Sequence, residues 1–169
     1  MKVNYPNLYI KVYKNPKILG FLRGISTASV AASVVSVGLS LLMTVLGSGW
    51  LSAIKLAAIL AIPFAVVSLL RKWINLGRPC EIFDFNLIGI SEEGFKRGCS
   101  FPSRHVFSGF LIAVALLPGL PVLGGLLLLL STALAISRVL LGMHFIRDVV
   151  AGAVIGVLSA VIGLVIFGI

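Results

Sequence analysis

Residues 51–72 read LSAIKLAAILAIPFAVVSLLRK, an apolar run in which Lys55 is the one charged residue before the terminal Arg71-Lys72 pair. At 1.5 Å per residue it would form a helix of about 33 Å, enough to cross the roughly 30 Å hydrocarbon core of a bilayer. Trp50 and Trp73 flank the run, and indole rings concentrate at the two membrane interfaces. The stretch therefore predicts a transmembrane helix.

The rest of the chain has the same apolar character. Of its 169 residues, 59% are hydrophobic and 11% charged, with a mean hydropathy of +1.15, which is more apolar than a soluble domain can hide from water. The apolar runs are long and do not alternate, which favours helices over a β-barrel. We predict an all-α, polytopic helical membrane protein, a single domain over residues 1–169, with about five transmembrane helices near residues 18–48, 51–72, 105–118, 120–141 and 147–168.

Two segments lie outside these runs. We expect no removable signal peptide in residues 1–17, where lysines occur without a short apolar core, and the tyrosines recur at helical spacing between the lysines. This fits either a short interfacial helix, a sixth in the count, or a basic unstructured tail. Residues 75–104 hold every acidic residue except Asp148 and predict the one sizeable extramembrane loop. The chain shows no internal repeat, which disfavours an inverted-repeat transporter.

The formal net charge of +9 fits nucleic acid, anionic lipid head groups or an anionic substrate as the partner. In a chain this apolar, anionic lipid head groups or a membrane-bound anionic substrate are favoured as partners, and we expect no binding of nucleic acid. If the spans alternate across the bilayer, every basic residue except Lys55 lies on one side, together with all the acidic residues and both histidines. Charges near a membrane are costly unless paired or used, so this boundary is a candidate functional site.

Three polar clusters reach this boundary from different predicted helices. They are Arg71-Lys72 with Arg78-Pro79, then Pro102-Ser103-Arg104-His105, and finally Ser137-Arg138 with His144 and Asp148. Arginine presents forked donors that match phosphate oxygens. His144 and Asp148 are four residues apart, so at a helix start the carboxylate can hold one ring nitrogen and leave the other as a nucleophile. His105 is placed to protonate a leaving group. The pattern predicts phosphate chemistry.

These clusters resemble the three-part signature of the type 2 phosphatidic acid phosphatase superfamily: K-x6-R-P, P-S-G-H and S-R-x5-H-x3-D. The third part is matched in full, and the second has Arg104 where the family pattern has glycine. In the first part Arg71 stands for lysine, with Lys72 one position late as the alternative.

The resemblance implies a helical membrane phosphatase that needs neither a metal nor another cofactor. In it His144 attacks phosphorus, Asp148 orients His144, and His105 protonates the leaving group. The phosphate would be bound by Arg71 or Lys72 together with Arg78, Ser103 and Arg138. Water would then hydrolyse the phosphohistidine.

A site at the interface predicts an amphiphilic substrate, a membrane lipid phosphate, whose chains stay in the bilayer. Lys96, Arg97 and Arg104 lie beside the signature, either as contacts for a multiply charged head group or as cations that meet anionic lipids in general. Lipid A with its 1-phosphate, undecaprenyl diphosphate and phosphatidylglycerol phosphate all fit. The alternative functions are a non-enzymatic anion channel or carrier and an anionic-lipid-binding scaffold.

The side of the membrane that carries the site is contested. The positive-inside rule places the basic face in the cytoplasm, whereas the family resemblance places it at the periplasmic face of a bacterial inner membrane, which we expect. Cys80 and Cys99 lie in the loop, after the first motif and before the second, and either a disulfide or two free thiols fits them. The last span has a small-residue face that permits close helix packing within one chain or between two, so the oligomeric state stays open; its residues are Gly152, Gly156, Ala160 and Gly163.

Overall fold

The computed structural model describes residues 5–85 and 97–168, which form seven α-helices and no strand. The helices are α1 (Tyr5–Lys14), α2 (Pro16–Ser48), α3 (Trp50–Ile74), α4 (Pro79–Ile82), α5 (Arg104–Leu116), α6 (Pro121–Leu140) and α7 (Ile146–Phe167). Helices α2, α3, α6 and α7 are long and apolar enough to cross a membrane, and α5 is a shorter apolar helix. The prediction of an all-α membrane protein with about five transmembrane helices is confirmed.

Local sequence explains several helix boundaries. The Asn15 side-chain oxygen accepts hydrogen bonds from two backbone N–H groups in the first turn of α2, and Pro16 takes the first helical position, where a missing N–H costs nothing. Gly49, at φ +84°, separates α2 from α3 in a conformation that favours glycine. Pro118 lies in the turn that follows α5, and Pro121 takes the first position of α6, where a missing N–H costs nothing.

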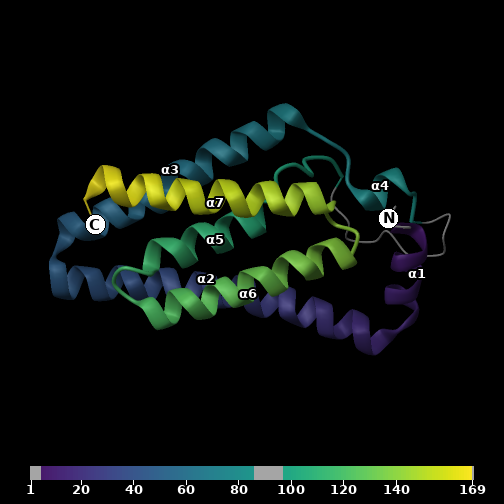
Figure 1. Cartoon of the computed structure of the whole chain (residues 1–169), viewed down its shortest axis with the longest axis horizontal. Helices are drawn as coiled ribbons and strands as arrows, with labels where there is room; N and C mark the ends of the chain where they lie inside the picture. The colour runs from purple at the N-terminus through teal and green to yellow at the C-terminus, as the bar shows by residue number, and fades with distance from the viewer. Residues whose placement is uncertain (1–4, 86–96, 169) are drawn as a thin grey trace.

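Helix α5 is the central element of the bundle (Figure 1). It packs against α2, α3, α6 and α7, and its 13 residues make a helix about 20 Å long. Gly152 and Gly156 of α7 lie so close to α5 that a Cβ at either position would meet the backbone oxygen of Ser103 or Phe107. These two glycines of the small-residue face therefore serve packing within this chain.

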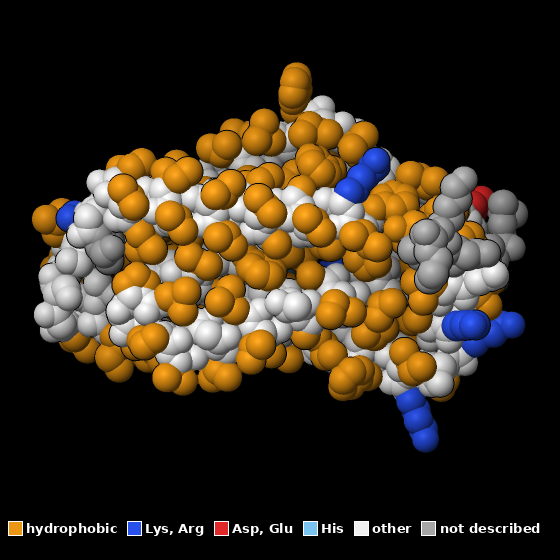
Figure 2. Space-filling view, in the orientation of Figure 1, with side chains coloured by type: hydrophobic (Ala, Val, Ile, Leu, Met, Phe, Trp, Pro, Cys, Tyr) orange, Lys and Arg blue, Asp and Glu red, His pale blue; other side chains and the backbone are white. Residues whose placement is uncertain are grey.

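The helix connections gather at two ends of the bundle (Figure 1). Helices α1 and α4, residues 97–103 and the 141–145 turn share one end, and the α2–α3 and α5–α6 turns lie at the other. Figure 2 shows apolar side chains along the length of the visible face, with Lys and Arg mainly toward the α1 and α4 end. The spatial division of polar and apolar residues thus follows the one expected from the sequence.

In the N-terminal segment, residues 5–14 form helix α1 and not an unstructured tail. Its Tyr9 is fully buried, with its ring centroid 5.1 Å from that of Phe85 after α4. The hydroxyl of Tyr13 donates a hydrogen bond to the carbonyl oxygen of Leu141 at 3.1 Å. Helix α1 therefore braces the end of the bundle where the polar clusters lie.

Candidate active site

Three backbone hydrogen bonds tie the three polar clusters together. They run from Ser103 N to Asp148 O at 2.9 Å, from Cys80 N to Gly142 O at 3.1 Å, and from Ser100 N to Leu76 O at 2.8 Å. Each bond joins two segments that are far apart in the sequence. The clusters therefore lie around one site at the α1 and α4 end of the bundle.

His144 lies in the turn between α6 and α7, with its side chain almost completely buried. The turn is held because the carbonyl oxygen of Arg138 accepts hydrogen bonds from the backbone N–H groups of Met143 and His144, at 3.0 and 3.3 Å. His144 Nδ1 is 3.8 Å from Asp148 Oδ2, longer than a hydrogen bond. The carboxylate faces the ring, as its spacing predicts, but does not bond to it directly in this state.

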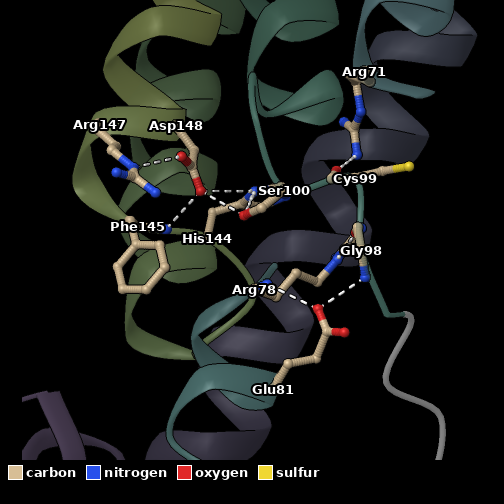
Figure 3. A network of polar contacts seen from close by, with 10 residues as sticks. All are labelled: Arg71, Arg78, Glu81, Gly98, Cys99, Ser100, His144, Phe145, Arg147 and Asp148. Carbon is tan, nitrogen blue, oxygen red and sulfur yellow. Dashed lines mark hydrogen bonds and ion pairs between the residues drawn. The ribbon is translucent and has the colours of Figure 1, made fainter. Parts of the chain in front are cut away.

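Ser100, a residue that the sequence does not single out, lies beside both groups (Figure 3). Its Oγ donates to Asp148 Oδ2 at 2.5 Å and is 3.5 Å from His144 Nδ1. The backbone N–H of Phe145 donates to the same carboxylate oxygen at 3.0 Å. Ser100 has no signal of its own in the sequence, because only the folded chain brings it to Asp148.

Burial lowers the pKa of His144 from its usual value. The nearby negative charge of Asp148 opposes this effect, and the positive charges of Arg78 and Arg71 add to it. The imidazole is therefore neutral at pH 7. With Nδ1 toward Ser100 and Asp148, Nε2 is the nitrogen available as a nucleophile.

Two buried donors of the cluster lack a hydrogen-bond partner among the described residues, namely Ser103 Oγ and Arg138 Nε. The Nη1 atom of Arg138 is held at 2.9 Å from the sulfur of Met143. Buried polar groups are nearly always hydrogen-bonded in folded proteins, so such donors call for an explanation. Hydroxyl and guanidinium groups are donors that suit the oxygens of a phosphate group.

The structure distinguishes the two candidate cations of the first motif. Arg71 is buried and its guanidinium donates to the carbonyl oxygen of Cys99, while Arg78 Nε donates to the carbonyl oxygen of Gly98 at 3.0 Å. Lys72 is exposed, because successive residues of a helix point about 100° apart. This placement favours Arg71, and not Lys72, for the first motif position.

Glu81 holds the segments that carry these arginines. Its Oε2 accepts hydrogen bonds from the backbone N–H groups of Arg78 at 2.9 Å and Gly98 at 2.8 Å. Burial pushes the pKa of Glu81 up, but these two hydrogen bonds and the positive charges of Arg97 and Arg78 together outweigh it, so the pKa lies below its usual value. From the sequence, Glu81 was only one of the loop's acidic residues.

An apolar groove leads from the cluster into the bundle. It has a volume of about 510 Å³, and helices α2, α3 and α5 supply most of its lining. His105, half-buried at the start of α5, lines it beside Arg104 and lies within electrostatic reach of Arg138 and His144. Along α2 the groove runs from residue 30 to residue 41, about 16 Å at 1.5 Å per residue. A hydrocarbon chain could follow this path from the bilayer to His105.

The loop residues Lys96 and Arg97 are predicted as head-group contacts, but the structure does not bring Arg97 to the cluster around His144. Arg97 is exposed and acts electrostatically on Glu81, and Lys96 lies outside the described residues.

Cys80 is buried, Cys99 is partly buried, and both are free thiols. Of the two alternatives, a disulfide or two free thiols, the structure has two free thiols.

The cluster is rich in cations and poor in metal ligands. Within residues 5–85 and 97–168, no three His, Cys, Asp or Glu side chains are grouped so that they could hold a metal ion. Arginine guanidinium groups can supply fixed positive charge to a transferring phosphoryl group. The arrangement of side chains is therefore suited to phosphoryl transfer from an anionic substrate.

Comparisons with solved structures agree with this fold. The chain resembles the crystal structure of Aquifex aeolicus LpxE at 21% identity and a TM-score of 0.67, over 96% of each chain. It also resembles the crystal structure of a transmembrane PAP2 type phosphatidylglycerolphosphate phosphatase from Bacillus subtilis at 19% identity and a TM-score of 0.68, over 95% of this chain and 83% of that one. Likeness at these identities establishes a shared fold.

Sequence comparisons identify the family. A relative described as bacitracin transport permease protein BcrC, from Bacillus licheniformis, is 44% identical over 61 residues, which are 36% of this chain and 30% of the relative. The match therefore spans less than a third of that protein. The family model for the PAP2 superfamily matches residues 34–168, which contain all three motifs. The chain therefore belongs to the PAP2 superfamily and is a multi-pass membrane protein of that family.

Proposed function

We propose that this protein hydrolyses a phosphomonoester or diphosphate on the head group of a membrane lipid, through a phosphohistidine at His144. The observation that carries the proposal is the surroundings of His144. The imidazole is buried and neutral, and its Nδ1 faces Ser100 and Asp148. Ser103 Oγ and Arg138 Nε, buried donors without a hydrogen-bond partner in the described part of the chain, belong to the same cluster.

In the first chemical step, His144 Nε2 attacks phosphorus and the bond from phosphorus to the lipid oxygen breaks. His105 gives a proton to that oxygen when it leaves as an alkoxide. Asp148 stabilises the positive charge that develops on His144. In the second step, water attacks the phosphohistidine as His105 takes its proton, the nitrogen–phosphorus bond breaks, and inorganic phosphate leaves.

The phosphoryl oxygens would be bound by fixed cations and a hydroxyl, contributed by Arg71, Arg78, Ser103 and Arg138. Charge in the transition state of phosphoryl transfer spreads over the three equatorial oxygens, where preorganised donors stabilise it most. We propose on this ground that the reaction needs no metal. The helix start at Ile146 adds backbone N–H groups and a favourable dipole near His144.

The groove supports a lipid substrate over a water-soluble one. Its apolar walls begin at His105 and follow α2 for about 16 Å, roughly half of the hydrocarbon core. A lipid tail in the groove would place its head group at the cluster. Lipid A 1-phosphate, undecaprenyl diphosphate and phosphatidylglycerol phosphate remain the candidate substrates.

The direct test measures inorganic phosphate release from these three lipids in detergent with EDTA, for the wild type and His144→Ala. We expect release by the wild type that EDTA leaves unchanged and that His144→Ala abolishes. A phosphoenzyme trapped from labelled substrate should be acid-labile and absent from the variant. Equal release by His144→Ala would reject this nucleophile, and full loss with EDTA would reject metal independence.

The acid role of His105 has its own test. His105→Ala should slow hydrolysis of an alkyl phosphate strongly, because the departing alkoxide needs a proton. Hydrolysis of a nitrophenyl phosphate should fall much less, because nitrophenolate leaves without one. Equal losses on both substrates would contradict the assignment and indicate a role in binding.

An anion carrier is the second candidate, and the transport name of the BcrC relative is the observation that favours it. In that case Arg71, Arg78 and Arg138 would line a path for an anion. Proteoliposomes loaded with labelled phosphate separate the two functions. Flux that survives His144→Ala, without hydrolysis by the wild type, would favour transport.

We propose that the site faces the periplasm of a bacterial inner membrane. Arg71, Arg78 and Arg138 belong to the cluster, so they do not report on topology. The exposed lysines of α1, however, count toward the cytoplasmic side under the positive-inside rule. The test replaces Lys14 by cysteine in a variant without other thiols. Labelling of intact cells by a membrane-impermeant maleimide is expected, and labelling only after lysis would place the site in the cytoplasm.

A further inference from the structure

Arg104 is a cation that the proposed chemistry does not use. Its guanidinium carbon lies 5.6 Å from the centre of the Phe64 ring of α3. Among the described residues no acidic side chain forms an ion pair with it. Arg104 lies within electrostatic reach of Arg71, which is also near Arg78. Asp148 lies near Arg71 and Glu81 lies near Arg78, but no carboxylate among the described residues forms an ion pair with any of these three arginines. This excess of positive charge favours an anion that carries more than one negative charge.

The place of Arg104 in the fold is specific. It is the first residue of α5, between Ser103 of the phosphate cluster and His105. It also lines the apolar groove together with His105 and Phe64. A lipid with its tail in the groove and its terminal phosphate at His144 would therefore pass Arg104 where the tail joins the head group.

We infer that Arg104 binds the phosphate attached directly to the hydrocarbon chain of a lipid diphosphate, while His144 attacks the terminal phosphate. This inference rests on the proposed function and narrows its substrate class. In a diphosphate the two phosphorus atoms share one bridging oxygen, so two adjacent anion-binding groups suffice. Ser103 and Arg104, next to each other at the start of α5, provide such a pair.

The chemistry of the step explains what Arg104 would do. Attack by His144 Nε2 on the terminal phosphorus breaks its bond to the bridging oxygen, and the lipid monophosphate leaves with that oxygen and its electron pair. A phosphate leaving group carries this charge at neutral pH without taking a proton. The guanidinium of Arg104 would stabilise the negative charge that develops on this leaving group. Water would then hydrolyse the phosphohistidine at His144 and release inorganic phosphate.

The test compares a prenyl diphosphate with the prenyl monophosphate of the same chain length, in detergent with EDTA. The measured quantity is the ratio of the two kcat/KM values. In Arg104→Gln the ratio of diphosphate to monophosphate should fall about 10- to 100-fold, the loss of one hydrogen-bonded contact between charged groups. Arg104→Lys should keep most of the preference, since the positive charge remains.

The control is Lys14→Gln, which removes one exposed charge at the same end of the bundle. Its ratio should match the wild type, so a similar fall there would show a general effect of net charge and overturn the inference. An unchanged ratio in Arg104→Gln, or equal losses on both lipids, would also overturn it. The proposed phosphatase function would survive these results, because it fails only if the wild type releases phosphate from none of the candidate lipids.

Discussion

Replacing Ser100 with alanine would remove the hydroxyl that contacts both Asp148 and His144. Ser100 and Asp148 are 1% and 0% exposed, and the Oγ to Oδ2 distance is 2.5 Å. A hydrogen bond to a charged group contributes about 1.5–3 kcal/mol, and each 1.4 kcal/mol corresponds to about a tenfold change in rate. Asp148 would keep the hydrogen bond from the backbone N–H of Phe145. We therefore expect kcat/KM to fall about 10- to 100-fold in a folded protein.

The same substitution should change the pH profile. In the wild type Ser100 occupies part of the hydrogen-bonding capacity of Asp148. Without it, the carboxylate acts more strongly on His144, and the pKa of His144 rises from its lowered value. The acidic limb of kcat/KM should then move to higher pH, because protonated His144 cannot act as a nucleophile.

The assay is phosphate release across the pH range, with thermal unfolding in detergent as the measure of stability. Ser29→Ala is the matched control, since Ser29 is also a buried serine, and its Oγ donates to Ile25 O at 2.7 Å outside the cluster. It should lose about 1 kcal/mol of stability and keep its activity. If Ser100→Ala changed kcat/KM less than about twofold with the same pH profile, the positioning role of Ser100 would be refuted.

Three further predictions concern a carboxylate, the nucleophile and a helix contact. Glu81→Gln should raise KM about fivefold, since about 1 kcal/mol is lost with the charge that holds two backbone N–H groups. In the wild type this contribution is present above the usual pKa of Glu81 and is lost as the pH falls through its lowered pKa. An unchanged KM in the variant would contradict this role of Glu81. The acidic limb assigned to His144 should lie below the usual histidine pKa and stay at the same pH for monophosphate and diphosphate lipids; a limb that moves with the substrate would belong to the substrate. Gly156→Ala should cost about 1–3 kcal/mol of stability, measured by thermal unfolding, because the added Cβ would overpack against α5. Gly125→Ala is the control and should cost little, because no atom lies within 4 Å of its added Cβ. Equal losses of stability in the two variants would exclude a specific contact at Gly156.

Much of the fold could be predicted from the sequence, because each transmembrane helix is determined by the residues of its own segment. A run such as residues 51–72 must satisfy its backbone hydrogen bonds within itself and place its side chains in hydrocarbon, so its length and composition predict a span. The turn at Gly49 and the end of α5 before Pro118 follow from residue chemistry in the same way. The two readings of the N-terminal segment could not be separated, because α1 is stabilised by Tyr9 packing against Phe85, far away in the sequence.

The motif residues could also be named from sequence, because the spacing of His144 and Asp148 follows from one helical turn. Their catalytic roles stay predictions. Which cation of the Arg71-Lys72 pair points inward depends on the phase of α3 against its neighbours, and only Arg71 is buried. Ser100 was missed since its role arises from contacts across 44 and 48 residues of chain.

By itself the sequence determined the helical membrane class, the approximate spans, the concentration of charge at one end and the motif residues of the family. These properties depend on the free energy of single segments and on spacing along one helix. Only the tertiary structure decided the inward position of Arg71, the Ser100 contact, the free thiols and the groove beside Arg104. Each of these depends on side chains from separate helices meeting in space, which the order of residues along one helix does not specify.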